Sequence, residues 1–176
     1  MTDLRHGEWQ LSYADTVYTF GTQETPAWNR TTPDLGDVDL RVADVGRPRQ
    51  DGRAFGVDYR GGKTITFDLG VRATSSGEVR DELATLARVW RADPVRLTPG
   101  AVAELRCVYD GRERLAYGRP RRFAPNTDDV SVNQYGTVIA DFAMMDDLFY
   151  GPTEESVSFS IVPGLGGGLE APLASP

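Results

Sequence analysis

The sequence predicts a mainly β fold with one packed α-helix, arranged as a β-barrel or β-sandwich. Most segments alternate apolar and polar residues with a period of two, and only one segment has helical periodicity. With 176 residues, 40% of them hydrophobic, the chain is long enough for one buried core. We expect one β domain over residues 1–162. Residues 163–176 are rich in Gly and Pro, and we expect there either a disordered tail or a linker that leads to a second domain outside this sequence.

The segment 8–21 predicts a β-hairpin with a short polar turn at residues 14–16. Its alternating apolar residues are Trp9, Leu11, Tyr13, Val17 and Phe20. Residues 22–37 contain two prolines and no periodicity, so we expect a loop that is long enough to have a function. Trp28 in this loop is either an exposed contact residue or a tryptophan folded back onto the core.

An extended hairpin is expected at residues 46–62. The preceding residues 38–45 alternate as a strand, with Val38, Leu40 and Val42 on one side. Residues 46–62 contain four arginines and five glycines, which permits two interpretations. An RGG-like basic segment would contact nucleic acid, but nearby aspartates oppose this. A two-stranded hairpin with a tight turn at residues 51–52 fits better, because Asp-Gly favours hairpin turns.

The clearest strand, residues 63–73, is followed by the only predicted helix, residues 76–92. Ser75 and Glu78 have the spacing of a capping box at the start of the helix, and Pro94 ends it. Its apolar stripe consists of Val79, Leu83, Leu86, Ala87 and Trp90. We therefore expect an amphipathic helix that packs on a sheet.

The remaining segments predict further strands. Residues 101–111 and 112–126 flank an Asp-Gly turn signal and read as two strands. Residues 128–147 read as one or two strands, and residues 155–163 as a last strand.

Charge and composition exclude several classes of function. The net charge of −7 and the pI of about 4.7 disfavour nucleic-acid binding. No apolar run is long enough to span a membrane, and no signal peptide is visible. All basic residues except Lys63 are arginines, which indicates a GC-rich coding genome. Cys107 reads as a small core thiol, and His6 as a residue of a polar terminus.

Catalytic and cofactor signatures are absent from the sequence. It contains no phosphate-binding P-loop, no nucleophile elbow and no HExxH zinc motif. One histidine and one cysteine exclude a catalytic triad with His and a thiolate metal cluster. We therefore expect no enzymatic activity, no cofactor and no metal.

Three aspartates in the segment 137–151 allow a competing interpretation as catalytic carboxylates. Asp141 alternates with apolar neighbours and faces the opposite side of a strand, whereas Asp146 and Asp147 lie where the alternation ends. Their spacing matches neither a calcium loop nor a demonstrated glycosidase pair. We therefore expect structural roles for these carboxylates.

The order of these features resembles the distal tail proteins, often labelled minor tail proteins, of long-tailed phages of actinobacteria. The resemblance rests on 47-RPRQDG-52 with the strand after it, 121-RRFAPN-126 and 140-ADFAMMDDLFYG-151, and it covers about residues 5–163. It implies a β-barrel-like domain related to the tail-tube fold. It also implies a virion structural protein at the tail tip, assembled in the host cytoplasm.

The resemblance further implies a ring, usually of six copies, that joins the tail tube to the hub, the baseplate and the receptor-binding proteins. Further implied partners are the tape measure protein and the tail fibres, with no membrane insertion. The hairpin at 46–62 would clasp the neighbouring subunit. The candidate subunit-contact residues are Arg47, Arg49, Asp51, Arg53, Phe55, Tyr59 and Arg60. The alternative is a monomeric module that binds carbohydrate or peptide through Trp9, Trp28 and Tyr59.

Overall fold

A computed structural model describes residues 4–49, 51–109, 111–128 and 130–152. The strand predicted at 155–163 and the linker predicted at 163–176 lie outside these residues. The large sheet has the order β2-β1-β9-β10-β11-β8-β3, and every pairing in it is antiparallel. Its strands are β1 (Trp9–Tyr13), β2 (Thr16–Phe20), β3 (Ala27–Asn29), β8 (Thr64–Arg72), β9 (Ala103–Tyr109), β10 (Arg112–Asn126) and β11 (Tyr135–Met144).

The two edges of this sheet meet and nearly close it into a barrel. The Gly21 amide donates to the Ala27 carbonyl at 2.8 Å, and the Asn29 amide donates to the Gly21 carbonyl at 3.0 Å. Gly21 has a φ of 118°, and a Cβ there would lie 2.6 Å from the Gly7 carbonyl oxygen, so only glycine fits. Ala27–Asn29 is thus a strand inside the segment that we expected to be a loop. Three residues are too few to show a period.

The barrel interior is filled by the apolar residues that the period-two alternation predicted to face inward. Ile65, Phe67, Leu69 and Val71 of β8 are fully buried. In β11, Val138, Ala140, Phe142 and Met144 are buried while their neighbours are partly exposed, as predicted. Cys107 is buried in the same core, also as predicted.

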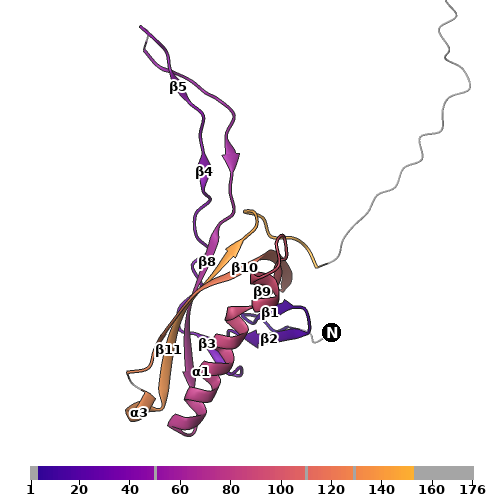
Figure 1. The fold of residues 1–176 in the computed structure, drawn as a ribbon, viewed down its shortest axis with the longest axis vertical. Helices are drawn as coiled ribbons and strands as arrows, with labels where there is room; N and C mark the ends of the chain where they lie inside the picture. Colours follow the sequence, from indigo (N-terminus) through magenta and orange to yellow (C-terminus); the bar gives the residue numbers. More distant parts are fainter. Residues whose placement is uncertain (1–3, 50, 110, 129, 153–176) are drawn as a thin grey trace, which may run out of the picture.

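Helix α1 (Ser76–Arg91) packs against one face of the sheet (Figure 1). The Ser75 hydroxyl accepts from the Glu78 amide at 3.2 Å, which confirms the N-cap. The Glu78 carboxylate accepts in turn from the Thr74 amide and hydroxyl. These hydrogen bonds lower the pKa of the Glu78 carboxyl. The buried stripe contains Val89 in place of the predicted Ala87, which is only partly buried.

Trp90 fixes the helix to the sheet. Its side chain is 1% exposed, and its indole N–H donates to the Asp141 carbonyl oxygen at 3.1 Å. Its ring meets those of Phe20 and Phe67 edge-on, with centroids 5.9 Å apart in each pair. The shorter helices α2 (Asp93–Arg96) and α3 (Val130–Asn133) follow α1 and β10.

One of the sequence predictions for strands is wrong, and another is confirmed for part of its length only. Residues 130–133, expected in a strand, form α3, because Val130 is buried and Gln134 adopts a left-handed conformation with φ 51°. Residues 38–45 alternate as predicted, but Leu40 and Val42 are exposed and belong to a projecting hairpin. Alternation marks the two sides of a strand without showing whether either side is covered.

Candidate assembly interface

A two-stranded hairpin projects from the barrel as the continuation of β8 (Figure 1). Residues 39–61, here called the arm, contain two short ladders that extend away from the other elements. The first pairs β4 (Leu40–Arg41) with β7 (Tyr59–Arg60), and the second pairs β5 (Val45–Gly46) with β6 (Arg53–Ala54). The arm starts earlier than the predicted residue 46, and a tight turn near Asp51-Gly52 ends it as expected, with Gly52 at φ 104°.

The root of the arm is fixed to the barrel. The Gly61 amide donates to the Asp39 carbonyl at 2.7 Å, and the Met144 amide donates to the Lys63 carbonyl at 2.8 Å. Arg60 forms an ion pair with Asp147 at 2.5 Å, and the Asp147 side chain is only 13% exposed. The direction in which the arm leaves the barrel is therefore set by backbone and side-chain contacts together.

Beyond its root, the arm exposes apolar side chains to solvent. Phe55 is 86% exposed, the highest value among the large hydrophobic residues described. The other exposed apolar residues of the arm are Leu40, Val42, Val45, Val57 and Tyr59. A monomer rarely exposes so many apolar side chains in one projection, and such surfaces mark contact sites.

The structure places all seven predicted contact residues on the arm, and all of them are exposed. The Arg47 amide donates to the Gly52 carbonyl at 3.3 Å across the tip, and Arg49 has a left-handed φ of 61°. Arg53 lies 3.8 Å from Asp44 on the opposite strand. Leu40, Val42 and Val45 were not among the predicted contact residues, because the hairpin was expected to begin only at residue 46.

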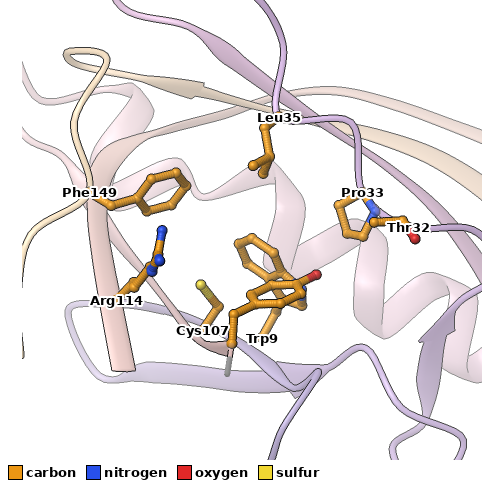
Figure 2. Close-up of a pocket in the computed structure, with 8 residues that line it drawn as sticks. Trp9, Thr32, Pro33, Leu35, Cys107, Arg114 and Phe149 are labelled. Carbon is orange, nitrogen blue, oxygen red and sulfur yellow. The ribbon is translucent and has the colours of Figure 1, made fainter. Parts of the chain in front are cut away.

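A second apolar feature lies at the mouth of the barrel, beside the arm root. A pocket of about 230 Å³ is lined mainly by Trp9, Tyr109, Phe149, Pro33 and Leu35, with the Cys107 sulfur at its wall (Figure 2). Burial raises the pKa of the Cys107 thiol to about 12, so this thiol stays protonated at neutral pH. Arg114 also lines the pocket. No pattern in the sequence brings these residues together, since they come from three strands and two loops.

The three aspartates of the segment 137–151 each have a different partner. Asp141 accepts from the Thr66 hydroxyl at 2.9 Å, Asp146 accepts from the Leu148 amide at 3.0 Å, and Asp147 pairs with Arg60. In the part of the chain that the structure describes, no group of three or more His, Cys, Asp or Glu side chains is placed to hold a metal ion. Within the same residues, no helix combines the length and apolar character needed to cross a membrane.

Replacing Asp141, Asp146 and Asp147 singly by Asn is expected to cost less than about 1 kcal/mol of unfolding free energy each. An Asn at 141 still accepts from Thr66, and the pair of Asp147 with Arg60 involves an exposed arginine. Urea denaturation of each variant checks this. A glycan-cleaving activity that the unchanged chain has and these variants lose would contradict the structural interpretation.

The tryptophans and tyrosine of the carbohydrate-binding alternative do not form one surface. Trp9 is fully buried, and Tyr59 lies on the arm. Trp28 is half-buried and packs over Gly70 and beside Tyr135, with ring centroids 5.8 Å apart. Trp28 is therefore neither a freely exposed residue nor a core residue.

Comparison with solved structures finds this fold in phage adsorption proteins. The chain aligns with the Dit (gp 19.1) protein of SPP1, a paradigm of the hub adsorption apparatus in phages infecting Gram-positive hosts, at 16% identity and a TM-score of 0.51. That alignment covers 82% of this chain and 52% of the other. The phage p2 baseplate in its activated conformation with Sr aligns at 11% identity and a TM-score of 0.59, covering 93% of this chain and 54% of the other. The form with Ca gives a TM-score of 0.58.

No protein-family model and no curated protein matches the chain. The chain spans about half the length of the phage proteins it aligns with. At these identities the likeness shows the fold. The prediction of a mainly β barrel-like domain with a packed helix and an extended hairpin is confirmed, and this fold is the one found in phage Dit and baseplate proteins.

Proposed function

We propose that this chain is a distal tail protein, a structural component of the tail tip of a long-tailed phage of actinobacteria. It forms a ring of six copies that joins the tail tube to the hub, the baseplate and the receptor-binding proteins. It acts in the virion after assembly in the host cytoplasm, and it carries out no catalysis. The single observation that supports this most is an exposed apolar arm on a barrel with the Dit and baseplate fold.

The arm suits contact between copies in a ring. About 12 residues separate its root from its tip, which corresponds to about 40 Å of extended strand. A domain of about 150 residues has a radius of gyration of about 15 Å, so the arm is about as long as its neighbour is wide. A closed ring needs two different surfaces on each subunit, and a projecting arm supplies one of them. The candidate contacts are the seven predicted residues, together with Leu40, Val42, Val45 and Val57.

The charges of the arm are suited to fixing the register of such a contact. Among the described residues, no ion pair is formed by Arg47 and Arg49 near the tip or by Asp51 beside them. Charged groups at the rim of an interface select the partner and its orientation more than they add affinity.

Light scattering of the purified chain, with negative-stain images of the same peak, tests the proposal. We expect ring-shaped particles with about six times the 19.3 kDa mass of one chain. A strict monomer at high concentration, with or without tail-tube protein, would contradict the proposal.

A further inference from the structure

Our further inference rests on the proposed ring and concerns its second surface. The arm is one apolar surface, and a head-to-tail contact requires a different one on the body of the neighbouring copy. On the body, the barrel-mouth pocket offers an apolar surface that includes exposed side chains. Leu35 lines this pocket, and Met145, Leu148 and Tyr150 flank the lining residue Phe149 in the chain.

The pocket has room for an aromatic ring. Its volume is about 230 Å³, and a dry apolar cavity of about 150 Å³ already holds benzene. Figure 2 shows the rings of Trp9 and Phe149, the Leu35 side chain and the Cys107 sulfur surrounding this space. An aromatic side chain would find mostly apolar contacts there.

Arg114 gives the pocket a charge preference. Its side chain is exposed, lines the pocket and forms no ion pair in the described residues. Lys63 adds a second cation nearby, since its ammonium group lies 4.8 Å from the centre of the Phe149 ring. An apolar group that carries neighbouring carboxylates would therefore match the pocket.

The arm supplies such a group. Phe55 is its most exposed aromatic residue, and the described residues show no ion pair for Asp51 and Asp58, which lie close to it in the chain. Phe55 lies six residues from the arm root at Gly61, about 20 Å along an extended strand. The arm points away from its own barrel (Figure 1), and the Phe55 side chain is 86% exposed, so its ring is available for contact with another molecule.

We propose that Phe55 of one copy inserts into the barrel-mouth pocket of the next copy, with the arm carboxylates facing Arg114. The contact is heterologous, because arm and pocket are different surfaces of the same chain. In this contact, the pocket of each copy is the surface that receives the arm of the neighbouring copy. The pocket lies beside the root of the arm that belongs to its own copy.

Disulfide cross-linking between two variants of the full chain tests this. Phe55→Cys and Leu35→Cys chains are mixed and mildly oxidised, and a cross-linked dimer is expected on a non-reducing gel. Each variant alone should give much less of this product. Phe55→Cys mixed with Val132→Cys, an 81% exposed residue on α3, should give none. All of these variants also carry Cys107→Ala, because the free Cys107 lines the same pocket and would otherwise compete for the thiol at position 55.

The outcomes separate this inference from the proposed ring. Rings that form without any cross-link between 55 and 35 overturn the pocket inference and leave the ring intact. A chain that remains monomeric overturns both. If the cross-link appears only in a chain that ends at Pro152, residues 153–176 of the same copy occupy the pocket, and the inference is wrong.

A charge reversal provides a second measurement. Arg114→Glu places a carboxylate opposite those of the arm and is expected to raise the concentration for half-assembly about threefold to tenfold. Arg112→Glu is the matched control, because Arg112 is also an exposed arginine of β10 with no ion pair to a described residue, but it does not line the pocket. Equal effects of the two substitutions would overturn the assigned role of Arg114.

Discussion

Replacing residues 42–58 by Asn-Gly is expected to abolish ring assembly and to leave the barrel folded. The two remaining ladder pairs, Leu40 with Arg60 and Arg41 with Tyr59, are then closed by a two-residue turn. None of the described residues in this range is buried, so the removal takes no described side chain from the core. The apolar side chains that we assign to the subunit contact are lost with the arm, apart from Leu40 and Tyr59.

Light scattering and thermal unfolding of this variant check both parts of the expectation. We expect a mass of one chain, and an unfolding temperature that differs from that of the unassembled parent by only a few degrees. Val132→Ala serves as a control for an exposed apolar residue outside the arm, and it should assemble normally. Rings with an unchanged mass in the shortened variant would show that the arm does not hold them together.

Trp90→Ala is expected to destabilise the domain by about 3–5 kcal/mol. The substitution removes the largest side chain that joins α1 to the sheet, together with its edge-on contacts to Phe20 and Phe67. It also leaves the Asp141 carbonyl without the indole donor. For a domain of about 150 residues this corresponds to a fall in unfolding temperature of roughly 6–20 °C.

Urea denaturation measures the loss of unfolding free energy when Trp90→Ala is introduced into the arm-shortened chain. Ring assembly does not contribute there, because that chain is expected to stay monomeric. Trp90→Phe keeps an aromatic ring and loses the donor, so it should cost less, about 1–2 kcal/mol. Arg88→Ala, on the exposed face of the same helix, should change the unfolding free energy by less than about 0.5 kcal/mol. A loss below about 1 kcal/mol for Trp90→Ala would contradict the role assigned to this residue.

The sequence by itself determined the elements whose signals are local. Period-two alternation identified β8 and the buried face of β11, because a buried face repeats at every second residue of a strand. Ser75 and the spacing of the apolar stripe identified α1, because capping and helical packing act over one or two turns. Asp51-Gly52 marked the tip of the arm, and the apolar setting of Cys107 marked it as a core residue. The alternation also placed Asp141 within β11 and Asp146 and Asp147 just beyond its end, where the structure has them.

Only the tertiary structure decided which alternating segments are covered. Residues 38–45 have the alternation of a core strand, but most of them are exposed to solvent. None of the described helices or strands covers their apolar side chains. Ala27–Asn29 closes the barrel because it pairs with Gly21 on one side and with β8, far away in the sequence, on the other. The barrel-mouth pocket combines Trp9, Leu35, Arg114 and Phe149, which lie far apart in the sequence. Burial and concave surfaces arise from contacts between distant segments, and no local period records such contacts.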